Sequence, residues 1–209
     1  MAARINLISP ELRATIETAR KIEVGNDRKA ILQPLVEYIQ AKVDQGHRAH
    51  LNFICTHNSR RSQLSQVWAH TAANYFGVPA TCCSGGVEVT AFNERAVASL
   101  MRSGFRVTSE GEENREYTVY YSENRKPIRA FSKLYDDPEN AASDFAAVMT
   151  CSDADENCPF IPGTEARIPV RYKDPKEFDG TPEEALKYDE RSLQIASEMF
   201  YVFSQIKNA

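Results

Sequence analysis

No apolar run in this sequence is long enough to span a bilayer, and its mean hydropathy is −0.47. An excess of positive charge is also missing, because 29 acidic residues outnumber 25 lysines and arginines and leave a net charge of −4. A nucleic acid is therefore not expected as a partner, nor is a membrane, and any site for an anion must be local. Residues 1–5 do not begin an apolar stretch typical of a secretion signal, so we expect the protein in the cytoplasm.

Cysteine is scarce, and the five that occur are Cys55, Cys82, Cys83, Cys151 and Cys158. An odd number in a reducing compartment argues against a structural disulfide framework. Three explanations stay open, which are metal binding, redox or nucleophilic chemistry, and simple burial. We expect burial for Cys82 and Cys83, which end an apolar strand.

Strands alternate with helices through most of the chain, which predicts an α/β fold with a mainly parallel sheet. Expected strands are 51–54, 78–83 and 145–150, with short candidates at 117–121 and 127–132 in the polar stretch 108–143, and expected helices lie at 62–75, at 93–103 and from 181 onward. The predicted architecture has three layers, with the central sheet flanked by helices. In such sheets the ligand binds at the carboxyl ends of the strands.

The first fifty residues predict two helices that carry no recognisable chemistry. Ser9 caps the first helix, Pro10 is its first residue and Gly25 ends it. The second begins at 26–27 or restarts at 33–34, and its apolar face is made by Ile31, Leu35, Ile39 and Val43. We therefore divide the chain into an amino-terminal helical extension, residues 1–49, and an α/β domain, residues 50–209.

The last helix is predicted to start at a capping box, Thr181-Pro182-Glu183-Glu184. Its expected apolar face contains Leu186, Leu193, Phe200 and Phe203.

The segment Cys55-Thr56-His57-Asn58-Ser59-Arg60-Arg61 joins an apolar strand directly to an amphipathic helix. A loop in this place points its backbone N–H groups inward and forms an anion site, which the helix dipole strengthens. Arg61 supplies a planar fork for two oxyanion oxygens, and the same field favours the thiolate of Cys55, a nucleophile for in-line attack. Ser62 can donate a hydrogen bond to that sulfur and make it a better leaving group. The alternative is a buried cysteine in a turn, with Arg61 in a surface ion pair.

Cys151 follows the strand 145–150, and Cys158 comes seven positions later, with acidic residues between them. Structural zinc sites favour about two to four intervening residues, so this spacing is poor for zinc, and no histidine lies nearby. We therefore expect no metal and favour redox chemistry, in which a movable segment carries Cys158 toward Cys151. The alternative is two thiols without a function in an acidic loop.

The loop from Cys55 to Gln63 resembles the signature of the low-molecular-weight tyrosine phosphatases and of their relatives, the thioredoxin-coupled arsenate reductases. The Ser62-Gln63 ending and the stretch from Cys151 to Pro159 are more similar to the reductases, and the resemblance runs from residue 50 to residue 207. His57 stands where the family usually has Gly, at a position that often needs a left-handed backbone. Arg60 replaces a residue that is frequently Cys and adds local positive charge.

This resemblance implies a mechanism for arsenate reduction and a role for each site residue. Cys55 attacks the oxyanion, which is bound by Thr56, His57, Asn58, Ser59, Arg60 and Arg61. Asp174, in the pair Asp174-Pro175, protonates the departing oxygen. Cys151 then attacks Cys55 and Cys158 attacks Cys151, so that arsenite leaves and thioredoxin, the expected electron donor, reduces the final disulfide. No tightly bound cofactor is expected.

The main alternative is hydrolysis of a phosphomonoester, such as a phosphoprotein, through a phosphocysteine at Cys55 with Asp174 as acid and then base. The loop fits both reactions, but only the reductase needs Cys151 and Cys158. Lys176 follows Asp174-Pro175 where phosphatases usually carry an aromatic residue, which weakens the phosphotyrosine hypothesis. A third alternative is a non-catalytic protein that binds phosphoproteins through their oxyanion without turnover. For Asp174 alone, the alternative is that Asp174-Pro175 forms an ordinary turn.

Overall fold

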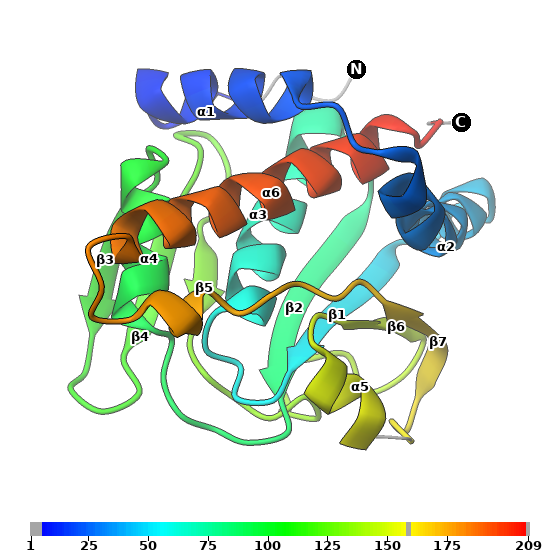
Figure 1. Ribbon diagram of the computed structural model, residues 1–209. Helices are drawn as coiled ribbons and strands as arrows, with labels where there is room; N and C mark the ends of the chain where they lie inside the picture. The colour runs from blue at the N-terminus through cyan, green and yellow to red at the C-terminus, as the bar shows by residue number, and fades with distance from the viewer. Residues whose placement is uncertain (1–5, 158–159, 208–209) are drawn as a thin grey trace.

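A four-stranded parallel sheet forms the centre of the computed structural model, which describes residues 6–157 and 160–207 (Figure 1). The strand order is β2-β1-β6-β7, with β2 at Ala80–Gly86, β1 at Ala49–Cys55, β6 at Phe145–Met149 and β7 at Thr164–Pro169. This confirms the predicted α/β class. Because all four strands are parallel, their carboxyl ends lie at one edge of the sheet, and the strands that precede Cys55 and Cys151 are neighbours there.

The long helix α3 (Arg61–Phe76) covers one face of the sheet, and the longer helix α6 (Glu184–Ser204) packs against α3. Trp68 on α3 is fully buried between them, where its indole N–H donates to Ser192 Oγ at 2.9 Å. Its ring meets Phe105 edge-on, with centroids 4.9 Å apart. Helix α4 (Glu94–Arg102) packs against the start of α6, at the left in Figure 1.

The opposite face of the sheet is covered by a short helix, α5 (Ser152–Asn157), and by part of the irregular segment 131–144. A smaller apolar cluster lies on this face and includes Ile54, Cys55 and Met149. The irregular segment lies very close to the sheet, because a Cβ on Gly85 would come within 2.3 Å of Tyr135 Cα. The sheet is thus flanked on both faces, as predicted, although by a thinner layer on the side of α5.

A second sheet is antiparallel, with the order β3-β4-β5 at Arg106–Glu110, Glu116–Tyr120 and Ile128–Ala130. The short candidates at 117–121 and 127–132 are confirmed by β4 and β5. Strand β3 was not predicted, because most of its side chains are exposed and its sequence shows no apolar alternation. Strand β7 was missed for a similar reason, since only Ile168 among its residues is fully buried.

The amino-terminal helices are α1 (Pro10–Lys21) and α2 (Asn26–Asp44). Ser9 caps α1 by accepting a hydrogen bond from Leu12 N, as predicted. The prediction that Gly25 ends α1 is wrong, because α1 stops at Lys21 and Gly25 is the cap of α2. Pro34 lies inside α2 without interrupting it.

The predicted apolar face of α2 is wrong at one position. Ile31 is 43 % exposed, and the neighbouring Leu32 is buried in its place beside Leu35 and Ile39. These residues belong to the same apolar core as the face of the sheet under α3 and α6. The division into an extension, 1–49, and a domain, 50–209, stays a prediction. None of the described helices has the length and the apolar character needed to cross a membrane.

Two further boundaries differ from the sequence predictions. Strand β2 does not stop before Ser84 but continues to Gly86, because these residues pair with Phe53 to Cys55 of β1. The capping box at the start of α6 does not form, since Thr181 Oγ1 donates to Phe178 O and Glu184 accepts from Gly180 N at 2.6 Å. Leu186 is 56 % exposed, so the predicted apolar face of this helix begins later.

Candidate active site

The loop of residues 56–60 connects β1 to α3, and its carbonyl groups are engaged from outside the loop. The carbonyl of Thr56 accepts hydrogen bonds from the backbone N–H groups of residues 87–88, both at 2.8 Å. The carbonyl of His57 accepts from Ser132 Oγ at 2.9 Å. The N–H groups of residues 57–60 have no hydrogen-bond partner among the residues that the structure describes. A loop with its carbonyls occupied and its N–H groups available is suited to binding an anion.

Gly86 at the end of β2 lies directly against this loop. A Cβ at this position would lie 2.8 Å from Asn58 N and 2.9 Å from Thr56 O, which are backbone atoms that cannot turn aside. The absence of a side chain is therefore what allows the loop to lie this close to the sheet.

Asn58 holds the loop together from inside. Its side chain is fully buried, with Nδ2 donating to Ser62 Oγ at 2.9 Å and Oδ1 accepting from Lys133 N at 3.0 Å and Gln63 Nε2 at 3.1 Å. Asn58 is also the loop residue with a left-handed backbone, at φ +47°. The expectation that His57 occupies the left-handed position is wrong by one residue, and Asn is the type that tolerates this conformation best after Gly.

Cys55 ends β1 with its side chain 4 % exposed and its Sγ 3.0 Å from Ser62 Oγ. Because Asn58 Nδ2 donates into the oxygen of Ser62, the hydroxyl proton of Ser62 is available for the sulfur. Ser62 is therefore arranged to donate a hydrogen bond to a Cys55 thiolate, an arrangement that stabilises the charged form.

Arg61 and Asp174 form an ion pair, although they are far apart in the sequence. Arg61 Nη2 lies 2.8 Å from Asp174 Oδ2, and Nη1 donates to the carbonyl of Tyr172 at 3.2 Å. Nε of Arg61 is buried and has no hydrogen-bond partner within the described ranges. Asp174 also accepts from Lys176 N at 3.1 Å and so caps a short 3-10 helix, η1 (Pro175–Phe178). The structure thus places the predicted acid beside the predicted oxyanion-binding arginine.

Arg60 extends toward α6, away from Arg61. Its Nε donates to the hydroxyl of Tyr188 at 3.0 Å, and this hydroxyl donates to Asp179 Oδ1 at 2.8 Å. Burial and the hydrogen bond to Asp179 raise the pKa of Tyr188 to about 12. Arg60 Nε also lies 4.0 Å from Asp174 Oδ1, so its side chain is held by α6, by the segment after η1 and by the predicted acid.

Cys151 lies beside the loop, directly after β6, with its side chain 1 % exposed. Its Sγ accepts a hydrogen bond from Ala154 N at 3.3 Å and lies 3.6 Å from Thr56 Oγ1. Thr56 Oγ1 donates its proton to Asp153 Oδ2 at 2.6 Å, so its lone pairs are available to the Cys151 thiol. The side chain of Thr56, which follows β1 and Cys55, therefore contacts Cys151.

The helix α5 starts immediately after Cys151 and is anchored by Asp155. Arg167 Nε donates to Asp155 Oδ1 at 3.0 Å, and Arg171 Nε donates to Oδ2 at 2.9 Å. Burial raises the pKa of Asp155, but these hydrogen bonds outweigh that effect and hold it below its usual value. The predicted resolving cysteine, Cys158, lies outside the described residues.

A buried ion pair lies behind the Asp174 segment. Arg28 of α2 donates two hydrogen bonds to the carboxylate of Glu198 on α6, at 2.9 and 2.7 Å. The Arg28 guanidinium also lies over the ring of Tyr172, 4.8 Å from its centroid. Tyr172 is the residue whose carbonyl accepts from Arg61, so helix α2 contacts the site through a single intermediate residue.

The remaining cysteines lie on β2, where Cys82 is buried and Cys83 is half-buried. Burial raises the pKa of both thiols, which disfavours the reactive thiolate. Among residues 6–157 and 160–207, no group of three or more His, Cys, Asp or Glu side chains is arranged to hold a metal.

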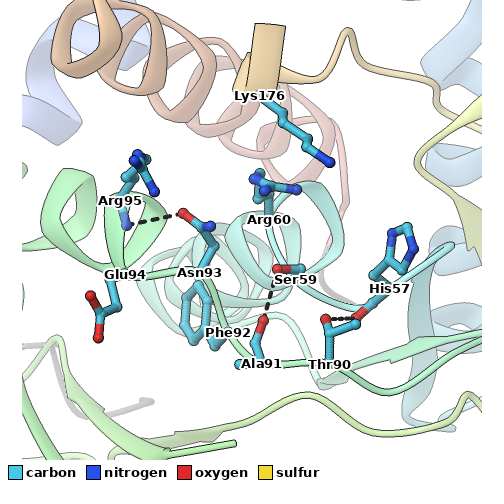
Figure 2. A pocket seen from close by; sticks show the side chains of 10 residues that line it. All are labelled: His57, Ser59, Arg60, Thr90, Ala91, Phe92, Asn93, Glu94, Arg95 and Lys176. Carbon is cyan, nitrogen blue, oxygen red and sulfur yellow. Dashed lines mark hydrogen bonds between the residues drawn. The ribbon is translucent and has the colours of Figure 1, made fainter. Parts of the chain in front are cut away.

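A cavity of about 490 Å³ opens beside the loop (Figure 2). Its wall contains the loop residues His57, Ser59 and Arg60, and it continues over residues 90–95 to Lys176. Sequence reasoning missed the contribution of Arg95, Asp179, Tyr188 and Glu184 to this region. No signal in the sequence marks them, because they reach the loop only through the packing of α4 and α6.

The sheet order β2-β1-β6-β7 and the loop between β1 and α3 give an α/β fold that is similar to that of the low-molecular-weight tyrosine phosphatases. A phosphotyrosine phosphatase of this type from Vibrio cholerae O395 superposes with a TM-score of 0.50, covering 75 % of this chain and 94 % of that one at 11 % identity. No family model matches the chain.

Arsenate reductases are similar to the chain in sequence. The arsenate reductase of Bacillus licheniformis is 26 % identical over 153 residues, which cover 73 % of this chain and 93 % of that protein. Arsenate reductase 2 of Staphylococcus epidermidis is 28 % identical over 123 residues, covering 59 % and 76 %. The chain is therefore similar in sequence to arsenate reductases and similar in fold to a low-molecular-weight tyrosine phosphatase.

Proposed function

We propose that the protein reduces arsenate to arsenite, with Cys55 as the nucleophile. The observation that carries the proposal is the second cysteine, Cys151, which is buried after the strand next to β1 and is joined to the loop by Thr56. Hydrolysis of a phosphoester has no use for this cysteine, whereas reduction of arsenic requires a second thiol. The sequence similarity to arsenate reductases points in the same direction.

In the first step the Cys55 thiolate attacks arsenic while the oxyanion is held by the loop N–H groups and by Arg61. An As–S bond forms, an As–O bond breaks, and Asp174 donates a proton so that the oxygen leaves as water. The ion pair of 2.8 Å between Arg61 and Asp174 supports this role, because it keeps the carboxyl group next to the bound oxygens.

In the second step the Cys151 thiolate attacks Cys55 Sγ. The As–S bond breaks, its electron pair stays on arsenic, and arsenic(V) leaves as arsenite while a disulfide joins Cys55 and Cys151. Ser62, 3.0 Å from Cys55 Sγ, can donate a hydrogen bond to that sulfur when the next step releases it as a thiolate. Cys158 would then attack Cys151, which releases Cys55 as a thiolate and leaves a disulfide between Cys151 and Cys158.

The electron donor proposed for the final disulfide is thioredoxin, by thiol–disulfide exchange. The compartment proposed is the cytoplasm, because every cysteine in the relay must start as a thiol and the cytoplasm keeps thiols reduced. The small-molecule partner proposed for the loop is the oxyanion itself, arsenate or phosphate.

The second candidate function is hydrolysis of a phosphomonoester by Cys55 and Asp174. The cavity of about 490 Å³ beside the loop favours it, since a bare arsenate ion does not need that space. A phosphoprotein is one substrate class for this reaction.

The variant Cys151→Ser distinguishes the two functions. We expect it to abolish arsenite production in an assay coupled to thioredoxin, thioredoxin reductase and NADPH, while hydrolysis of an aryl phosphate continues. The matched control is Cys82→Ser, which removes a buried thiol outside the relay. Arsenite production that survives Cys151→Ser would show that the proposed relay is wrong.

A further inference from the structure

The cavity beside the loop is lined by several cations and a single carboxylate. Arg60, Arg95 and Lys176 line it together with His57, whereas Glu94 is the one acidic lining residue in the described part of the chain. The carboxylate of Glu94 is 78 % exposed and pairs with Arg115, at 3.5 Å, outside the cavity. The lining is thus positive in a protein whose net charge is −4.

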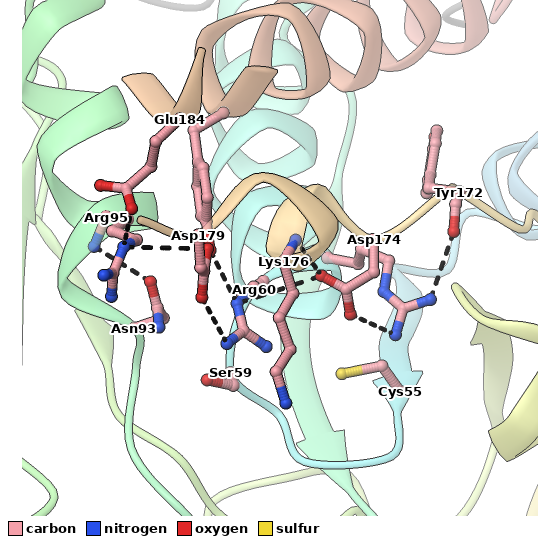
Figure 3. A network of polar contacts seen from close by, with 12 residues as sticks. Cys55, Ser59, Arg60, Asn93, Arg95, Tyr172, Asp174, Lys176, Asp179 and Glu184 are labelled. Atoms are coloured by element: carbon pink, nitrogen blue, oxygen red, sulfur yellow. Dashed lines mark hydrogen bonds and ion pairs between the residues drawn. The ribbon is translucent and has the colours of Figure 1, made fainter. Parts of the chain in front are cut away.

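The two arginines are held in place by acids that do not line the cavity. Arg95 Nε lies 2.7 Å from Glu184 Oε2 and 3.7 Å from Asp179, and Arg60 is bonded to Tyr188 (Figure 3). The terminal nitrogens of both guanidinium groups form no hydrogen bond with the residues in the described ranges, and Arg60 Nη2 lies 3.8 Å from Asp179 Oδ2 as a longer ion pair. Such an arrangement fixes the position of the positive groups and leaves their donors available to a ligand.

Lys176 is placed between the cavity and the proposed acid. Its backbone N–H donates to Asp174 Oδ1 at 3.1 Å, while its side chain runs from η1 toward the loop in both Figure 2 and Figure 3. Its ammonium group forms no ion pair with any residue that the structure describes. An ammonium group at this position binds an anion well and provides no flat surface for an aromatic ring.

We propose that this cavity is a second anion subsite, which selects small phosphomonoesters whose organic part carries a carboxylate or a second phosphate. The proposal rests on the oxyanion loop and on the second candidate function, phosphomonoester hydrolysis, because the phosphate must sit at Cys55 while its substituent extends past His57, Ser59 and Arg60. The volume of about 490 Å³ suits a small organic anion. The second anionic group would meet Lys176 first and the two arginines behind it.

The test compares two probes that differ in one charged group. Phosphoglycolate and ethyl phosphate share the phosphate and a two-carbon substituent, but only phosphoglycolate carries a carboxylate. We expect isothermal titration calorimetry at low salt to give about tenfold tighter binding of phosphoglycolate to the reduced wild-type protein, because low salt leaves the attraction between its carboxylate and the cationic lining largely unscreened. Raising the ionic strength should reduce this ratio.

Two lysine variants separate the subsite from the general field of the protein. Lys176→Ala should lower the preference for phosphoglycolate to about twofold or less, as expected when the nearest charge is removed. Lys173→Ala is the matched control, because Lys173 also neighbours Asp174 and has the same charge but does not line the cavity. It should keep the preference of the wild type.

The outcomes also separate this inference from the proposed function. Equal affinity of the wild type for both probes would overturn the subsite, and so would an equal loss of preference in the two lysine variants. If ethyl phosphate, orthophosphate and arsenate all fail to bind, the oxyanion loop itself is wrong, and the subsite falls with it.

Discussion

The ion pair between Arg28 and Glu198 connects the amino-terminal helices to the back of the active site, and its removal should be costly. The Glu198 side chain is only 3 % exposed, so Arg28→Ala leaves a buried carboxylate without its partner. Breaking such a pair from one side costs about 3–5 kcal/mol, and because the Arg28 side chain is 20 % exposed we take the lower end, about 3 kcal/mol. In a protein of this size that corresponds to a fall of roughly 6–12 °C in Tm.

An exposed pair provides the control for this prediction. Arg102 and Asp189 form an ion pair at 2.8 Å, with side chains 42 % and 40 % exposed. Arg102→Ala should therefore cost no more than about 1 kcal/mol. The double variant Arg28→Met with Glu198→Met should recover most of the stability, because it removes both buried charges and keeps apolar volume.

Urea denaturation followed by tryptophan fluorescence measures all of these variants. The chain has a single tryptophan, Trp68, which is fully buried against α6 and so reports directly on the region of Glu198. The reasoning would be refuted if Arg28→Ala destabilised the protein no more than Arg102→Ala, or if the double variant cost as much as the sum of its single changes.

Two other predictions address the loop and the acid stability. Gly86→Ala places a Cβ within 2.9 Å of three backbone atoms. We therefore expect calorimetry to show about a tenfold or greater loss of orthophosphate affinity. The control Gly25→Ala, whose Cβ would have no atom within 4 Å, should keep the affinity of the wild type. The pKa of His70 is lowered to about 4, first by burial and then by Arg48. In the unfolded chain His70 has its ordinary pKa and takes up a proton as the pH falls below it, whereas in the folded protein it stays neutral. The free energy of unfolding therefore has its full value above the ordinary pKa of histidine and falls by about 2 kcal/mol between pH 7 and pH 5. His70→Gln should make the urea midpoint less dependent on pH over this range, and an unchanged dependence would rule out His70 as its source.

The chemistry of the loop was predictable from the sequence because it is local. Cys55, Arg61 and Ser62 lie within eight consecutive residues, and a strand followed by a helix fixes their relative positions. Even here one backbone detail was wrong, since the left-handed residue is Asn58 and not its neighbour His57. Three side-chain hydrogen bonds determine that detail, and one of them joins the loop to Lys133, far along the chain.

The wider surroundings of the site depend on contacts between distant segments. Arg60 meets Tyr188 across 128 positions, and Arg28 meets Glu198 across 170. Neither pair leaves a periodic pattern or a motif in the sequence. The strand β7 also escaped prediction, because edge strands with half-exposed side chains lack the apolar run by which β1 and β6 are recognised.

The way in which the loop is held has a consequence for the order of folding. Its carbonyl at His57 is bound by Ser132, 75 positions later, and its carbonyl at Thr56 is bound by the chain just after β2. Closing such long segments is slow compared with forming a helix turn. The anion cradle is therefore completed late, after β2 and the 131–144 segment have docked, and a chain that is still folding carries the Cys55 thiol without the means to capture an oxyanion beside it.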